Sequence, residues 1–120
     1  MKDKEKRDLI DRTTRFALCI IELYSGLPKT TVAQVVGRQV LRSGTSVGAH
    51  YREANRAKST ADFISKIEGA LQELDESQYW LELLRDAGCL EDKVYRSLWQ
   101  EADELLAILV TIVKKAKTRA

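Results

Sequence analysis

Residues 39–54 read QVLRSGTSVGAHYREA, and this stretch decides the fold. It lies in a longer segment, residues 31–57, whose apolar side chains fall on one side of a helical wheel: Val32, Val36, Val40, Val47, Tyr51 and Ala54. Each glycine in it costs a helix roughly 1 kcal/mol relative to alanine. Because Gly37, Gly44 and Gly48 project within about 40° of one another, we predict a continuous helix with a groove that lets another helix come close. A break near residues 43–45 is the alternative.

Two other segments show the same helical spacing, and none alternates like a strand. The first runs from about Lys4 to Ser25 and ends before Pro28, because proline disfavours the helical conformation of the residue that precedes it. The second starts at Ser59, where the sequence STAD resembles a capping box. It ends at Gly88, where a left-handed C-terminal glycine is expected.

A fourth helical segment, from about Glu91 to Lys117, completes the set. The connections between the segments are short, so neighbouring helices should run antiparallel. We therefore predict an all-α fold, an antiparallel up-down-up-down four-helix bundle that forms a single domain over residues 1–120.

The fourth segment carries two apolar stripes about 100° apart. The first comprises Val94, Leu98, Leu105, Leu109, Ile112 and Ala116, and the second comprises Tyr95, Trp99, Leu106, Val110 and Val113. One helix of a bundle needs only one such stripe. Neighbouring helices could cover the second stripe, but an exposed apolar strip of this length is a liability. We therefore predict that the second stripe is an interface of a homo-oligomer.

Composition restricts the class of protein. The chain has 120 residues, of which 44% are hydrophobic and 32% charged, which argues against disorder. The longest strongly apolar run, residues 105–113, is far shorter than the roughly 20 residues of a membrane span. The first eight residues alternate in charge without an apolar region behind them, so we expect no secretory signal, no membrane association and a cytoplasmic location. With two separated cysteines and one histidine, no metal or cofactor is expected.

Charge is distributed unevenly along the chain. Residues 29–58 carry a net charge of +5 and residues 59–88 a net charge of −5. Arginines 38, 42, 52 and 56 fall in a stripe about 80° wide on one helix. The candidate binding residues are Arg38, Arg42, Arg52, Arg56 and Lys58.

Two interpretations of this stripe remain open. The arginines could form a solvated face that pairs with the acids of residues 59–88. They could instead bind a phosphate backbone or an acidic partner, since guanidinium groups hold phosphate through two parallel hydrogen bonds. No aromatic residue lies on the stripe, so backbone contact is favoured over stacking on single-stranded bases.

Catalytic motifs are missing. The sequence lacks the phosphate-binding, dinucleotide-binding, zinc-protease and nucleophile-elbow motifs. A di-iron bundle needs the Glu-x-x-His motif twice, and His50 is the single histidine. A helical ribonuclease could pair Arg42 with His50, but a satisfied, partly buried histidine is the simpler interpretation. We therefore expect a protein that is not an enzyme.

Several blocks together resemble a bacterial four-helix-bundle family first noticed as reading frames within intervening sequences of 23S ribosomal RNA genes. The blocks are QVLRSGTSVGAHYREA at 39–54, STADFISKI at 59–67, ALQEL at 70–74, YWLELL at 79–84 and GCL at 88–90. Positions that match the family pattern are Arg42, Ser43, Ser46, Glu53, Asp62, Phe63, Glu73 and Trp80. His50 departs from it, because relatives often place asparagine there.

The resemblance implies a closed four-helix bundle and a ring-like homo-oligomer, which is often a pentamer in relatives. One branch, the accessory variability proteins of diversity-generating retroelements, binds a reverse transcriptase and nucleic acid through a basic surface. The first hypothesis is therefore an oligomeric, non-enzymatic accessory protein associated with RNA. The alternative is a scaffold or adaptor that binds an acidic protein partner without nucleic acid.

Overall fold

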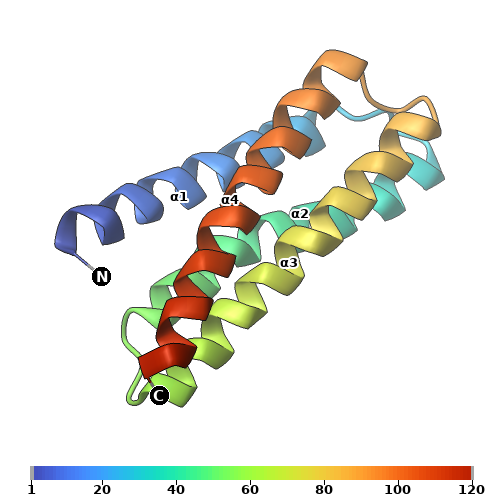
Figure 1. Cartoon of the computed structure of the whole chain (residues 1–120). Helices are drawn as coiled ribbons and strands as arrows, with labels where there is room; N and C mark the ends of the chain where they lie inside the picture. Colours follow the sequence, from blue (N-terminus) through green and yellow to red (C-terminus); the bar gives the residue numbers. More distant parts are fainter. Residues whose placement is uncertain (1, 120) are drawn as a thin grey trace.

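Four α-helices and no strand make up residues 2–119, the part of the chain that this computed structural model describes. The helices are α1 (Asp3–Ser25), α2 (Thr31–Ala54), α3 (Thr60–Asp86) and α4 (Asp92–Arg119). Consecutive helices run antiparallel in a rod of 47 × 22 × 19 Å (Figure 1). The predicted all-α class and the four helices are confirmed, although α2 ends three residues before the predicted position 57. None of these helices is long and apolar enough to cross a membrane.

The predicted start and end of α3 are confirmed. The Ser59 hydroxyl accepts the backbone N–H of Asp62 at 3.1 Å, and the Asp62 carboxylate accepts the N–H of Lys58 at 3.3 Å. Gly88 follows α3 with a φ of 76°, a conformation that favours glycine. These contacts satisfy backbone groups that the helix leaves unpaired and so fix where α3 begins and ends.

Glycines set the distance between α1 and α2. The α2 helix is continuous, as predicted, and the alternative of a break near residues 43–45 is wrong. A Cβ atom at Gly44 would lie 2.8 Å from Ile20 of α1, and one at Gly48 would lie 3.2 Å from Thr13. The predicted groove for a close helix is therefore confirmed, with α1 as the helix that fills it.

Buried side chains from all four helices form one core, in which α3 lies between α2 and α4. Its fully buried members include Phe16, Ile20, Val40, Val47, Tyr51, Ile67, Leu74, Leu81, Leu105 and Leu109.

The core-facing line of α4 runs between the two predicted stripes and takes residues from both. Tyr95, Leu98, Ala102, Leu105, Leu109 and Val113 are buried. Val94, from the predicted core stripe, is instead 37% exposed. The alternative that neighbouring helices cover the second stripe is therefore correct for Tyr95 and Val113.

The seam between α1 and α4 is the loosest in the bundle, because these helices touch along much less of their length than consecutive helices do. Cavities of about 550 Å³ and about 690 Å³ open along it. Arg12 bridges the seam: its guanidinium contacts Glu101 at 2.7 and 2.8 Å and Glu104 at 2.6 Å. Hydrogen bonds from Arg12 and then from Gln100 lower the pKa of the Glu104 carboxyl below its ordinary value.

We expect Gly44→Ala to destabilise the protein. Alanine gains about 1 kcal/mol of helix propensity, but the added methyl overlaps Ile20, and overpacking of this kind costs about 1–3 kcal/mol. Urea unfolding should show a net loss of stability. In the Ile20→Ala background the two closest atoms, at 2.8 and 3.0 Å, are removed and only the Cβ at 3.2 Å remains, so the same substitution should be much less destabilising. Equal effects in both backgrounds would contradict the steric role of this glycine.

The bridge at Arg12 should make stability depend on pH. Since the pKa of Glu104 is lowered in the folded state, its contribution is present above the unfolded carboxyl pKa and is lost as pH falls through the folded value. Arg12→Ala should therefore lower the melting temperature by a few degrees at pH 7, and the difference from wild type should shrink below about pH 4. Arg15→Ala, an exposed neighbour without an ion pair in the described structure, is the control. A difference that stays constant across this pH range would contradict the bridge.

Candidate nucleic-acid interface

The arginine stripe lies on the outer face of α2. The buried valines of the helix point inward, and Arg38, Arg42 and Arg52 are exposed. Arg56, predicted to continue the stripe on the helix, instead lies in the turn after α2 ends at Ala54, and both it and Lys58 are exposed there. All five candidate residues are therefore exposed, three of them on α2 and two in the connection that follows it. Their electrostatic environments differ.

Arg42, in the middle of the stripe, is neutralised by α3. Its Nη1 lies 3.1 Å from Glu73 Oε2, and its Nη2 lies 2.8 Å from Glu76 Oε1. Two carboxylates against one guanidinium leave this position without positive charge. For Arg42, the interpretation as a partner of the acids of α3 is correct.

A polar network beneath Arg42 joins α2 to α3. The buried hydroxyls of Ser43 and Ser77 lie 2.8 Å apart, and Ser77 donates to the backbone carbonyl of Glu73 at 2.8 Å. His50 Nε2 lies 3.8 Å from Glu73 Oε2. The histidine ring packs on α3 at Gly69, where a Cβ atom would lie only 3.0 Å from its Nδ1. Several positions singled out by the family resemblance thus hold the two helices together.

The other cations of the stripe are less constrained. Arg52 donates to the Thr14 hydroxyl of α1 at 3.2 Å, a neutral contact that leaves its charge in place. Within residues 2–119, Arg38, Arg56 and Lys58 form no ion pair with an acid. The positive potential of the face therefore comes from Arg38 at one end and from Arg52, Arg56 and Lys58 at the other.

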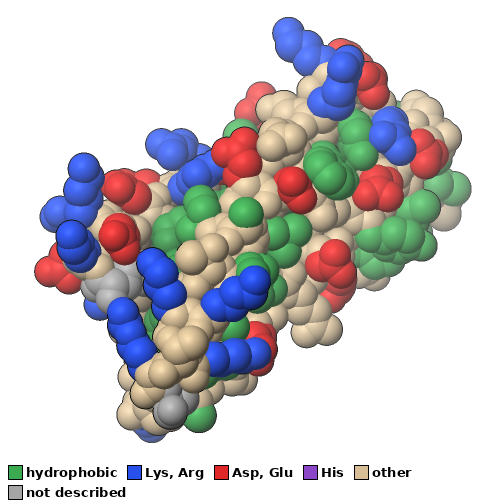
Figure 2. Space-filling view, viewed as in Figure 1, with side chains coloured by type: hydrophobic (Ala, Val, Ile, Leu, Met, Phe, Trp, Pro, Cys, Tyr) green, Lys and Arg blue, Asp and Glu red, His purple; other side chains and the backbone are tan. Residues whose placement is uncertain are grey.

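Further cations extend the stripe beyond α2. The α2–α3 loop, the start of α1 and the end of α4 meet at one end of the bundle, where blue side chains gather in Figure 2. Lys2, Lys6, Lys115 and Arg119 lie there. These residues were not among the candidate binding residues predicted from the sequence. The sequence feature that could have indicated them is a run of four cations in residues 114–119 without an intervening acid.

The residues predicted to form an oligomer interface occupy different depths. Tyr95 and Val113 are buried within the single chain, and Trp99 and Leu106 are partly buried against the core. Trp99 also donates its indole N–H to Glu82 at 3.0 Å. Val110, at 36% exposure, is the member most accessible to a partner.

Other chemistry has little support in the described residues. Between residues 2 and 119, no group of three or more His, Cys, Asp or Glu side chains is placed to hold a metal ion. His50 and Arg42 of α2 are instead paired with Glu73 and Glu76 of α3. These ion pairs join the two helices.

Comparisons with other proteins agree on one family. The model of the 23S rRNA-intervening sequence protein family matches residues 5–111. A crystal structure from Bacteroides thetaiotaomicron VPI-5482, described as a protein with unknown function from the S23 ribosomal protein family, is similar in fold with a TM-score of 0.85. It shares 39% sequence identity, over 91% of this chain and 97% of that one. No curated protein matches the sequence.

Proposed function

Because the chain belongs to the 23S rRNA-intervening sequence protein family, we propose that it is a non-enzymatic accessory protein that binds the phosphate backbone of RNA through the outer face of α2. The observation that carries this proposal is the set of exposed cations without acid partners at both ends of the arginine stripe. Arginine pairs with phosphate through planar, charge-assisted hydrogen bonds.

The shape of this face favours backbone contact over base recognition. Arg38, Arg42 and Arg52 follow one helix, with Arg56 in the turn after it, and Arg42 is already paired with α3. Contacts to phosphate give affinity without sequence information, whereas specificity requires contacts to base edges. We therefore expect binding that depends strongly on salt and weakly on sequence.

A salt series tests this function. The double variant Arg38→Gln/Arg56→Gln should bind single-stranded RNA more weakly than wild type. The slope of log affinity against log salt should fall by about 0.7 for each phosphate that the variant no longer neutralises. Fluorescence anisotropy with a labelled RNA measures both quantities.

Arg42→Gln is the matched control on the same face. Its guanidinium is already engaged by Glu73 and Glu76 and is not free to hold a phosphate, so the salt slope should fall less than in Arg38→Gln or Arg56→Gln. Wild-type binding by the double variant would show that the stripe is not the interface. If wild type binds no RNA at low salt, a partner captured from nuclease-treated cytosol would support the alternative of an adaptor for an acidic protein.

We further propose that the chain forms a homo-oligomer through the side of the bundle where α1 and α4 meet. The seam there has two cavities, and hydrophobic side chains are visible between these helices in Figure 2. Leu9 of α1 and Ile108 and Ile112 of α4 line the first cavity, and Val94 of α4, which is 37% exposed, lines the second. Apolar side chains of a second copy would cover this surface and reduce its contact with water.

Light scattering should give a mass several times the 13.6 kDa of one chain. Val94→Glu, at a residue that lines the second cavity, should reduce that mass, because burying an unpaired carboxylate in an apolar interface is unfavourable. Val32→Glu, at a still more exposed valine on α2, is the control that should leave the assembly intact. A monomeric wild type at high concentration would overturn this proposal. If only Val32→Glu reduced the mass, the interface would lie on α2 and the proposal would also be wrong.

A further inference from the structure

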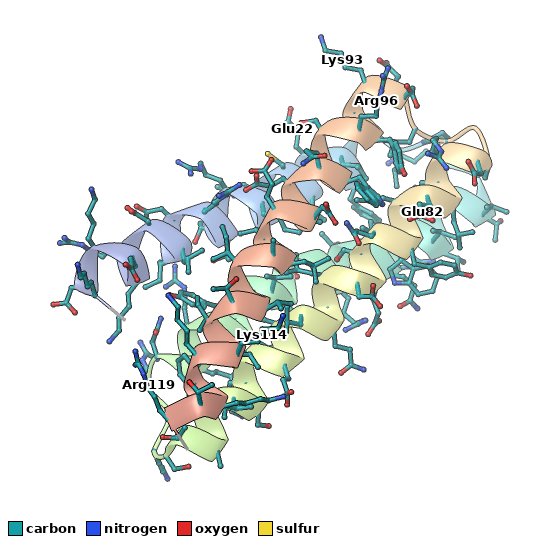
Figure 3. All side chains as sticks on the ribbon, in the orientation of Figure 1. Glu22, Glu82, Lys93, Arg96, Lys114 and Arg119 are labelled. Atoms are coloured by element: carbon teal, nitrogen blue, oxygen red, sulfur yellow. The ribbon has the colours of Figure 1, made fainter. Side chains whose placement is uncertain are left out.

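One end of the bundle concentrates positive charge. It is formed by residues 2–8, 52–62 and 114–119, which together hold eleven lysines and arginines against five acids, a net charge of +6. The rest of the chain has a net charge of −4. In Figure 3, Arg119 lies at this end, whereas Lys93 and Arg96 lie at the opposite end of α4.

Two adjoining cavities open at this basic end. One, of about 370 Å³, is lined by Lys6, Lys58, Ser59 and Thr60 among others, and the second, of about 470 Å³, by Lys2, Glu5 and Lys115. They share Phe63, Ala116 and Arg119, so they form one continuous depression, which we call the terminal cleft. Its combined size is within the range of small-molecule sites.

The cations of the terminal cleft are available for a ligand. Within the described part of the chain, none of Lys2, Lys6, Lys58, Lys115 and Arg119 forms an ion pair with an acid. The neighbouring Lys117, by contrast, is paired with Glu68 at 3.1 Å. Like charges held close together without partners repel one another and destabilise the compact state.

Helix stability does not explain the position of three of these cations. Lys2 and Lys6 lie at the start of α1, and Lys58 lies just before α3. Helix N-termini carry partial positive charge, so cations there are unfavourable, whereas Lys115 and Arg119 are favourable at the end of α4. Lys2, Lys6 and Lys58 therefore add positive charge where the backbone is already positive, an arrangement that suits an anion.

We propose that the terminal cleft binds a nucleoside triphosphate group, either a free nucleotide or the 5′-triphosphate end of an RNA. Five cations around one depression match a compact group of several negative charges, whereas the straight stripe on α2 matches an extended backbone. The partly buried ring of Phe63, which both cavities share, offers an apolar surface on which a base can stack. The Glu5 carboxylate, at the rim, can accept a hydrogen bond from a ribose hydroxyl.

Calorimetric titration of the full chain with ATP, GTP, inorganic triphosphate and adenosine tests this site. ATP and GTP should bind, inorganic triphosphate more weakly, and adenosine most weakly. The double variant Lys58→Gln/Arg119→Gln should weaken ATP binding by about tenfold for each charge-assisted hydrogen bond that is removed. The matched control Lys93→Gln/Arg96→Gln changes the same residue types at the opposite end and should bind ATP as wild type does.

Phe63→Leu distinguishes the contribution of the base to binding from that of the phosphates. It should weaken ATP binding and leave inorganic triphosphate binding unchanged, a pattern that loss of folding would not produce. Failure of wild type to bind ATP and GTP at low salt would overturn the proposal. Equal losses in the two double variants would also overturn it, because they would show a general effect of charge.

RNA oligomers of one sequence, with a 5′-triphosphate or a 5′-hydroxyl, distinguish the two sources of the group. Tighter binding of the triphosphate form supports an RNA end as the ligand, and equal binding together with ATP binding supports a free nucleotide. The terminal cleft shares Lys58 with the candidate nucleic-acid interface, but Arg38 and Arg56 do not line it. Arg38→Gln/Arg56→Gln should therefore retain binding of inorganic triphosphate, even if RNA binding by the stripe is disproved.

Discussion

The close contact of α1 with α2 is the constraint on which the arrangement of the bundle depends. Three glycines on one face of α2 leave no side chain between the helices, so Ile20 and Thr13 of α1 rest almost on the α2 backbone. This contact draws α1 toward α2, and α1 therefore makes few contacts with α4 on its other side. Arg12 then holds that seam through two glutamates where little apolar packing is available. If α1 packed as closely on α4 as on α2, the two cavities between α1 and α4 would be filled.

The α2 helix has three faces with different physical roles. Its glycine face receives α1, its apolar face enters the core, and its outer face carries the arginines. Arg42 lies where the outer face of α2 meets α3. Its guanidinium lies over two buried serines and the nearly buried Glu73. A buried carboxylate is costly unless it is paired, so Arg42 is needed for packing and contributes little to the positive surface.

Local features were predictable because each depends on a few neighbouring residues. The capping residues Ser59 and Asp62, the left-handed Gly88 and the glycine groove follow from backbone chemistry at single positions. The inward face of α4 was not predictable in the same way, since Tyr95 and Leu98 are both apolar and helical periodicity ranks adjacent apolar stripes equally. Which stripe faces inward depends on the partner helices. The pairing of Arg42 depended similarly on the register of α2 against α3.

The basic end was hidden from sequence analysis because its residues are more than 100 positions apart, from Lys2 to Arg119, and only the fold brings them together. It also has a consequence for assembly. The chain is polarised along its long axis, with positive charge at one end and net negative charge over the remainder. Subunits that pack side by side in parallel through α1 and α4 would gather several basic ends on one face. Their repulsion would oppose assembly, and a polyanion across that face would relieve it, so binding of nucleic acid and oligomerisation would favour each other.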